Sequence, residues 1–144
     1  MSNQNCIFCG IVEDPSQSEV VWNDDVAIAF MDINPVTDGH VLVIPRAHHT
    51  ALTDLPPDTA AHMMRVGQHL ARTLRASELK AEGINLFFAE EKVAGQEVFH
   101  SHLHVIPRHA DDGFVVTGGR EGRTSESLAQ SAHSLRSALS EEQG

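Results

Sequence analysis

Positive charge is scarce in this 144-residue chain, which carries 10 Lys and Arg against 20 Asp and Glu, for a formal net charge of −10. Sequence-independent binding of nucleic acid and docking on an anionic membrane both need a basic surface, so this balance argues against both. Long apolar runs are also lacking, since no window approaches the ~18 consecutive apolar residues of a membrane span. Residues 1–5 are polar and begin no signal-peptide pattern, so we expect a cytoplasmic location.

Cysteine is almost absent as well, and the two that occur, Cys6 and Cys9, lie three positions apart. The 41% of hydrophobic residues suffices for a core without disulfides. The C-x-x-C spacing is typical of a redox pair or of a zinc site. A redox pair belongs in a β-α-β setting, which this sequence lacks, whereas zinc needs two further ligands. His48 and His100 are candidates, and a buried, reduced cysteine pair is the alternative.

Apolar alternation and turn residues predict five short strands, at 18–22, 26–31, 40–44, 84–88 and 97–106. A long helix is predicted from the entry signal that begins at Asp54 to about residue 78, because apolar residues recur there at helical spacing. Residues 6–13 are expected to form a short turn or helical piece. This order, with mostly short connections, predicts an α+β domain on a largely antiparallel five-stranded sheet.

The composition changes near residue 115, so we divide the chain into a domain over 1–115 and a C-terminal tail over 116–144. Residues 117–127 are rich in Gly, Arg, Ser and Thr and are expected to form a flexible linker. Apolar residues then recur at intervals of four, three and four, which predicts a weakly amphipathic helix over 128–139.

Several residues receive an ordinary structural interpretation. The aromatic residues Trp22, Phe30, Phe87 and Phe88, on predicted strands, are expected in the core. His62 and His69, seven positions apart on the long helix, are expected to be solvated.

Histidine is abundant, at ten residues, and three of them alternate along the last predicted strand. On a strand, His100, His102 and His104 would share one face, with neighbours ~6.6 Å apart and the two ends ~13 Å apart. Two neighbouring imidazoles could lean onto one metal ion, but three could not without breaking the strand. At least one of the three histidines therefore has another function.

The string Gly95–Arg108, GQEVFHSHLHVIPR, resembles the His-φ-His-φ-His-φ-φ signature of the histidine triad (HIT) superfamily as its bacterial, zinc-bearing members carry it. Three further motifs agree with the family in the same order: CIFC at 6–9, FMDINP at 30–35 and GHVLVIPRAH at 39–48. The resemblance covers roughly residues 5–114. It implies a homodimeric α+β fold that binds purine nucleotides and acts as a nucleotidyl hydrolase or transferase.

The resemblance also implies a role for each residue at a matched position. The catalytic positions are His102 as nucleophile, His104 beside the phosphate, and His40. The nucleotide-binding positions are Phe30 and Ile33 at the base, Asp32 at the ribose hydroxyls, and Gly95 and Gln96 beside the phosphate. The metal positions, which hold a structural zinc in zinc-bearing members, are Cys6, Cys9, His48 and His100.

These residue types suit chemistry at a phosphorus atom. A neutral imidazole is a good nucleophile near pH 7, so we expect His102 to attack the α-phosphorus and form a nucleotidyl-histidine that water then hydrolyses. His104 and His40 would donate hydrogen bonds to the phosphate oxygens or the leaving group. No catalytic metal is required, and a zinc ion at His100 would be structural.

Three alternatives stay open. The substrate could be a dinucleoside polyphosphate instead of the favoured nucleoside phosphoramidate. The chain could bind nucleotides with little catalysis, because Ala89, Glu90 and Glu91 stand where the family often has Asn near the phosphate. Carboxylates there would repel phosphate unless they point to solvent. A metallohydrolase with His100 and His102 on a catalytic ion is the third class.

Overall fold

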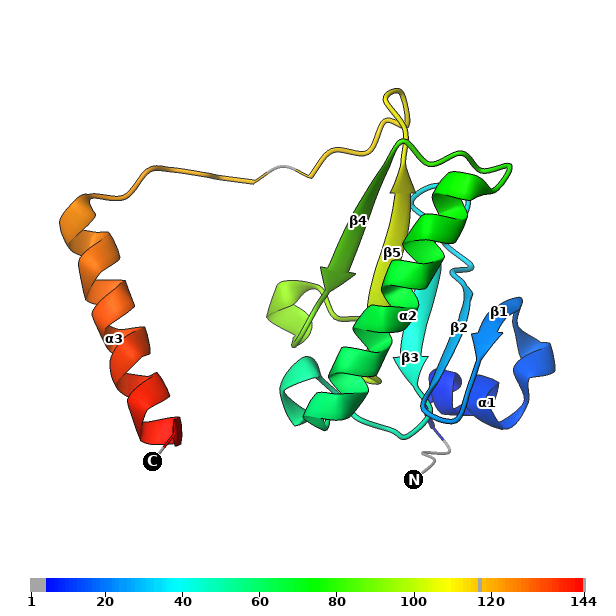
Figure 1. Ribbon diagram of the computed structural model, residues 1–144, viewed down its shortest axis with the longest axis horizontal. Coiled ribbons are helices and arrows are strands. Elements are labelled where there is room, and N and C mark those ends of the chain that lie inside the picture. Colours follow the sequence, from blue (N-terminus) through cyan, green and yellow to red (C-terminus); the bar gives the residue numbers. More distant parts are fainter. Residues whose placement is uncertain (1–4, 117, 144) are drawn as a thin grey trace. The chain divides into compact units, whose positions relative to one another are not determined.

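A computed structural model describes residues 5–116 and 118–143, and the chain divides into two compact units, Met1–Gly113 and Phe114–Gly144. The first unit contains a five-stranded antiparallel sheet in the order β1-β2-β3-β5-β4 (Figure 1). In chain order the strands are β1 Val20–Asn23, β2 Ala27–Met31, β3 Val41–Pro45, β4 Gly83–Phe88 and β5 Leu103–Arg108. The predicted α+β class and antiparallel sheet are confirmed.

Two helices belong to the first unit: α1 (Ile7–Glu13) and α2 (Pro57–Ala76). Three short 3-10 turns accompany them, at Pro15–Gln17, Leu52–Asp54 and Lys92–Ala94. The second unit contains α3 (Ser125–Gln143), which extends the predicted tail helix at both ends. Within the described ranges, no helix combines the length and apolar character needed to cross a bilayer.

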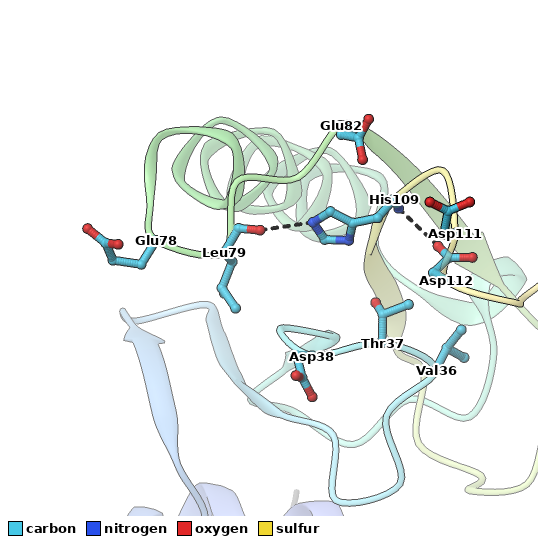
Figure 2. Close-up of a pocket in the computed structure, with 9 residues that line it drawn as sticks. All are labelled: Val36, Thr37, Asp38, Glu78, Leu79, Glu82, His109, Asp111 and Asp112. Atoms are coloured by element: carbon cyan, nitrogen blue, oxygen red, sulfur yellow. Dashed lines mark hydrogen bonds between the residues drawn. The ribbon is translucent and has the colours of Figure 1, made fainter.

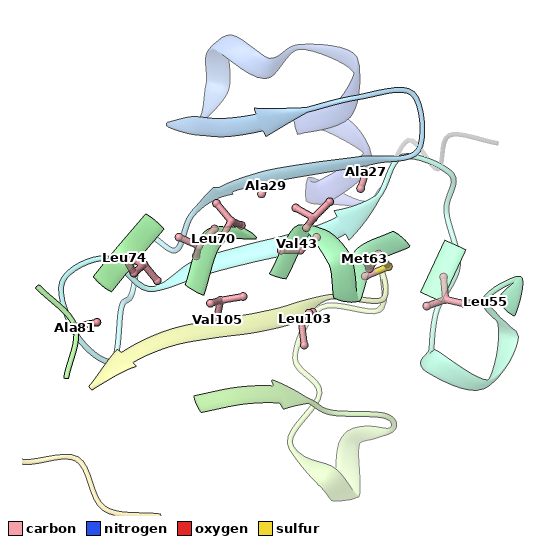
Figure 3. Packing of buried hydrophobic residues seen from close by; sticks show 12 residues of the cluster. Ala27, Ala29, Val43, Leu55, Met63, Leu70, Leu74, Ala81, Leu103 and Val105 are labelled. Atoms are coloured by element: carbon pink, nitrogen blue, oxygen red, sulfur yellow. The ribbon is translucent and has the colours of Figure 1, made fainter. Parts of the chain in front are cut away.

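One face of the sheet is covered by α2, which packs over β5, β3 and β2. Side chains alternate between the two faces of a strand, and the residues that face α2 include Ala29, Val43 and Val105. Helical periodicity brings Met63 and Leu70 of α2 onto them (Figure 3). This is the larger hydrophobic cluster of the domain.

The other face of the sheet carries the alternate residues and is partly covered by α1. Ile28, Phe30, Leu42 and Ile44 form a second buried cluster there with Phe8 of α1. The rings of Phe8 and Phe30 meet edge to face, with centroids 5.3 Å apart. Because this cover is short, the rest of the face is free to form a site.

Strand register aligns four side chains in one row across this second face. Phe30 lies opposite Leu42, Leu42 opposite His104, and His104 opposite Phe87. A single row therefore places the third histidine of the motif between two apolar neighbours on β3 and β4.

Two glycines are required by close approach of the backbone to other groups. A Cβ at Gly67 of α2 would lie 2.9 Å from a methyl carbon of the buried Leu103, so glycine lets the helix approach the sheet closely. Gly39 has a φ of +96°, and a Cβ there would lie 2.8 Å from Leu79. This turn directly precedes His40 and fixes where that side chain enters the site.

The last strand differs from its prediction over 97–106, since β5 begins only at Leu103. Residues before it leave the ladder: the Ser101 amide donates to the His49 carbonyl at 2.6 Å, outside the sheet. His100 and His102 consequently precede the strand and only His104 lies on it, although the rings of His102 and His104 still lie side by side, with centroids 4.9 Å apart.

The expectation that both His62 and His69 are solvated holds for His69, which is exposed, whereas His62 is half-buried. His62 Nε2 lies 2.7 Å from Oδ2 of Asp24, and this carboxylate also accepts a 2.7 Å hydrogen bond from the indole of Trp22. The His69 ring stacks on Trp22 at a centroid distance of 5.6 Å. Both histidines therefore join α2 to the β1–β2 hairpin.

Candidate active site and metal centre

A cavity of about 480 Å³ lies on the α1-bearing face of the sheet, within the size range of small-molecule sites. Six of the residues predicted for the site line it: Asp32, Ile33, His40, Gly95, His102 and His104. They come from the end of β2, the start of β3, the loop before β5, and β5 itself. The fold thus gathers residues more than 60 positions apart into one hollow.

The orientation of His102 leaves one ring nitrogen available inside this cavity. Its Nδ1 lies 2.7 Å from the backbone carbonyl of His100, and a carbonyl only accepts, so Nδ1 must carry the proton. In the neutral ring Nε2 then holds an unshared electron pair. This tautomer presents a nucleophilic nitrogen.

A second chain of hydrogen bonds orients His104. The Val36 amide donates to Nδ1 of His40 at 3.0 Å, so His40 carries its proton on Nε2. That Nε2–H points to Nδ1 of His104 at 2.9 Å, and His104 therefore carries its own proton on Nε2. Two adjacent imidazoles thus have opposite tautomers: His102 offers an acceptor and His104 a donor.

Burial lowers the pKa of all three cavity histidines. It lowers the pKa of His104 to about 4, with the neighbouring His102 and His40 adding to the effect. Burial also lowers the pKa of His40, against the opposing pull of Asp32, whose carboxylate is 3.5 Å from Nε2. In His102 burial outweighs the His100 carbonyl and the Asp32 and Glu97 carboxylates. The three rings are neutral at pH 7.

Apolar side chains that the sequence did not single out form the rest of the cavity. Ile7, Phe8 and Ile11 of α1 line it, as does Phe87 of β4. Phe87 is 50% exposed and its ring meets that of His104 at 5.6 Å, so its assignment to the core is wrong. Its alternation on β4 was visible in the sequence, but its position on an edge strand beside the motif was not.

Two predicted nucleotide-binding residues lie behind the cavity, not in its wall. Phe30 is buried beneath Phe8. Gln96 is buried too, and its amide nitrogen donates to the carbonyls of Thr50 (2.6 Å) and Val98 (3.1 Å). The structure therefore has Gln96 anchor the loop that carries Gly95.

The segment 89–91, where the sequence departs from the family pattern, does not line the cavity. Ala89 is buried, and the carboxylate of Glu90 accepts hydrogen bonds from the backbone amide and hydroxyl of Thr53. Glu91 is exposed, and its amide donates to Gln96. The carboxylates of Glu90 and Glu91 therefore do not face the cavity, where they would repel a phosphate.

The four residues predicted for metal binding meet beside α1. One ligand atom from each of Cys6, Cys9, His48 and His100 lies within 4.8 Å of the others. Nδ1 of His100 is 3.5 Å from both sulfurs, and Nδ1 of His48 is 3.3 Å from the Cys9 sulfur. Ligands in a tetrahedron around zinc, at bond lengths of about 2.0–2.3 Å, stand roughly 3.5 Å apart. The set therefore fits a tetrahedral ion.

Hydrogen bonds orient the ring of His100 toward the cysteines, unlike the ring of His102, which faces the cavity. Nε2 of His100 donates to the Pro45 carbonyl at 2.8 Å, which leaves Nδ1 to face the cysteines. This outer bond fixes the ligating nitrogen. A catalytic metal shared by His100 and His102 is at odds with this arrangement, because the ligand atom of His100 meets those of Cys6, Cys9 and His48, and His102 is not in that group of described residues.

A larger cavity, of about 540 Å³, lies away from this chemistry (Figure 2). Its lining is strongly acidic and includes Asp38, Glu78 and Glu82, and it shares only Val36 with the histidine cavity. His109 lies in it, with Nε2–H donating to the Leu79 carbonyl at 2.9 Å. None of the residues predicted for the site lies there, so volume alone would misplace it.

Fold and site together define a small α+β protein in which a histidine-lined cavity adjoins a Cys₂His₂ cluster. The family model for the HIT domain matches residues 13–111, and the chain belongs to this family.

Similar proteins agree with this assignment. An uncharacterised HIT-like protein from Borreliella burgdorferi is 42% identical over 118 residues, which is 81% of this chain and 85% of its own length. The crystal structure of a Zn-bound histidine triad family protein from Mycobacterium smegmatis is 40% identical, with a TM-score of 0.73 over 93% of this chain and 97% of that one. That of a histidine triad nucleotide-binding protein from Candida albicans is 28% identical, with a TM-score of 0.85 over 95% and 99%.

Proposed function

We propose that this protein is a purine nucleotide-binding nucleotidyl hydrolase that cleaves nucleoside phosphoramidates through a covalent intermediate on His102. The observation that carries the proposal is the tautomer of His102, whose Nδ1–H bonds the His100 carbonyl and leaves Nε2 unprotonated in the cavity. In the first step a bond forms from Nε2 to the α-phosphorus and the P–N bond breaks. Water then attacks the same phosphorus and frees His102.

The neighbouring histidines support charge stabilisation at phosphorus. The Nε2–H of His104, set by the His40 relay, is available to donate to a nonbridging oxygen. These donors need no reorganisation during the reaction, because their tautomers are fixed before substrate arrives. The scheme requires no catalytic metal.

A nucleoside suits the remainder of the cavity. The carboxylate of Asp32 is ready to accept from the ribose hydroxyls, and its Oδ1 already accepts from the Asn34 amide at 2.8 Å. The apolar side chains of Phe8, Ile33 and Phe87 offer surface for a base. The Candida albicans relative, a nucleotide-binding protein by name, supports the same ligand class.

Charge favours phosphoramidates over dinucleoside polyphosphates. Among the described residues, no Lys or Arg lines the cavity, and the histidines there are neutral at pH 7. A polyphosphate leaving group carries several negative charges that nothing in this lining would balance, whereas an amine leaves without negative charge. Nucleotide binding with weak catalysis is the second candidate, favoured only by the missing amide at Ala89.

The Cys₂His₂ set is proposed to hold a structural zinc ion. The ligands join α1 to the loops that follow β3 and precede β5, and His100 also supplies the carbonyl that orients His102. An ion there would fix ring and loop positions without touching substrate. Cysteine ligands suit the reducing conditions of a cytoplasmic location, which we propose as well.

A homodimer is proposed through α2 and the free edge of β4. Met64 and Leu86 are 49% and 44% exposed and line one groove between these elements, next to the polar Arg65 and Gln68. An unpaired edge strand with apolar neighbours tends to be covered. Sedimentation of wild type as a dimer and of Leu86→Glu as a monomer is expected. Val21→Glu, on the β1 edge, is the matched control and should stay dimeric.

The catalytic proposal is tested by hydrolysis of adenosine 5′-phosphoramidate with chelator present in the assay. Wild type should turn over, and His102→Ala should fall below a few per cent of that rate. His133→Ala, an exposed histidine on α3, controls for loss of an imidazole. A His102→Ala protein that kept more activity would contradict the covalent scheme, while tight binding of adenosine monophosphate without turnover in wild type would select the second candidate.

A further inference from the structure

Glu97 lines the histidine cavity, and the proposed nucleotide contacts leave it without a role. Of the described lining residues, Asp32 and Glu97 carry carboxylates, and the ribose hydroxyls account only for Asp32. Glu97 lines the same cavity as His102, the proposed nucleophile. Its exposed side chain therefore belongs to the wall that surrounds the reacting histidine.

The backbone around Glu97 is firmly held. The buried amide of Gln96 bonds the carbonyls of Thr50 and Val98 on either side, and its oxygen accepts from the Glu91 amide at 2.9 Å. This anchoring gives Glu97 a fixed place in the cavity wall.

A second, smaller cavity of about 320 Å³ continues past Glu97. It shares Ile7, Glu97 and Val98 with the histidine cavity and adds Asn5, Phe99 and two members of the Cys₂His₂ set, Cys6 and His48. Glu97 thus lies on the rim between two hollows. The histidine cavity would hold the nucleoside and its phosphate, and the smaller cavity has room for the leaving amine.

The charges around this rim have one sign. Within the described part of the chain, neither cavity is lined by Lys or Arg. The Cys₂His₂ set, two of whose members line the smaller cavity, would not reverse this, since two thiolates balance a divalent ion. Among the described residues that line the smaller cavity, Glu97 alone carries a carboxylate, so it is the anionic partner that a positive group would meet once Cys6 and His48 hold a metal ion.

We infer that Glu97 is a specificity-determining residue for the leaving group, and that it favours amines carrying a second, positively charged nitrogen. This inference rests on the proposed phosphoramidase function. The distal ammonium does not react. The scissile nitrogen, protonated from solvent, departs with the P–N bonding pair as the Nε2–P bond to His102 forms.

Three adenosine 5′-phosphoramidates test the inference. Their leaving amines are of equal chain length and end in an ammonium, a hydroxyl or a carboxylate. An exposed ion pair yields a modest gain, so wild type should prefer the ammonium over the hydroxyl by about three- to fivefold in kcat/KM, and the hydroxyl over the carboxylate by a similar factor. Raising the salt concentration should shrink both ratios.

Variants assign the preference to one side chain. Glu97→Gln should bring the three substrates within about twofold of one another. A circular dichroism spectrum and a Tm that match those of wild type show that the variant is folded. Glu91→Gln removes an exposed carboxylate nearby that lines neither cavity, and it should keep the wild-type order.

The outcomes separate this inference from the proposed function. Hydrolysis of all three substrates at equal rates by wild type would overturn the role of Glu97 and leave the phosphoramidase function standing. A preference that survived in Glu97→Gln would also overturn it. If wild type hydrolysed none of the three, the proposed function would fail and the inference with it.

Discussion

Removing metal from the Cys₂His₂ set is expected to destabilise the domain measurably. The four ligands cross-link α1 to two loops that are 39 and 91 or more residues away in sequence. A ligand that binds only the folded state stabilises it by about 2.7 kcal/mol when present at 100 times its dissociation constant. For a unit spanning Met1–Gly113, each kcal/mol corresponds to about 4 °C in Tm. Chelation should therefore lower Tm by about 10 °C.

The effect should extend to the histidine cavity, because two residues of α1 that lie next to the metal ligands in sequence also form part of its wall. Ile7 and Phe8 lie between Cys6 and Cys9 in sequence and line the cavity. Loosening this helix would remove apolar contacts to the nucleoside. We expect KM for adenosine 5′-phosphoramidate to rise on chelation by more than kcat falls.

Calorimetry of zinc-loaded and chelator-treated protein measures the first effect, with metal content determined on the same samples. One zinc ion per chain is expected after loading. Cys9→Ser should begin at a lower Tm and show no further shift with chelator. Equal Tm values for loaded and treated wild type, or an equal chelator shift in Cys9→Ser, would refute the reasoning.

Three further results are expected. Burial by itself raises the pKa of Asp24, but hydrogen bonds from Trp22, two backbone amides and His62 together lower it. Because Asp24→Ala removes all of these hydrogen bonds, it should lower the free energy of unfolding by about 3 kcal/mol and Tm by about 10 °C. Asp25→Ala, at the exposed neighbouring residue, is the control and should unfold like wild type. Asp32→Asn should raise KM about tenfold for the ribonucleoside substrate and leave KM for its 2′,3′-dideoxy analogue unchanged, and equal effects on both would argue against a ribose contact. Burial lowers the pKa of His104 to about 4, so this histidine stays neutral in mildly acidic solution. The value of kcat/KM should therefore stay level from about pH 8 to pH 6 and fall only as pH drops below about 5. A decline centred near pH 6.5 would contradict buried, neutral histidines in the cavity.

The sequence was sufficient for the elements whose signals are local. Alternation and turn residues predicted all five strands, although β5 begins at Leu103 and not near residue 97. That boundary could not be read locally, because the amide of Ser101 bonds the distant His49 carbonyl and so leaves the sheet. A periodic string cannot show a competing partner 52 positions away.

The site residues that belong to a sequence motif were predictable. Whether a side chain lies in the cavity wall or behind it depends on its burial, which the sequence does not show. His40, His102 and His104 lie together as the resemblance implied. Gln96 is drawn behind the wall because its amide satisfies two loop carbonyls. Glu97 borders two cavities, and no sequence pattern reports a cavity.

The covalent step on His102 is the central claim, and trapping the intermediate tests it most directly. Wild type is mixed with excess adenosine 5′-phosphoramidate, quenched in base to preserve a phosphorus–nitrogen bond to histidine, and digested for mass spectrometry. The account predicts one adenylyl group, located on His102, that forms and decays at rates compatible with turnover. Steady hydrolysis with no adduct on His102, or with the adduct on another histidine, would contradict it.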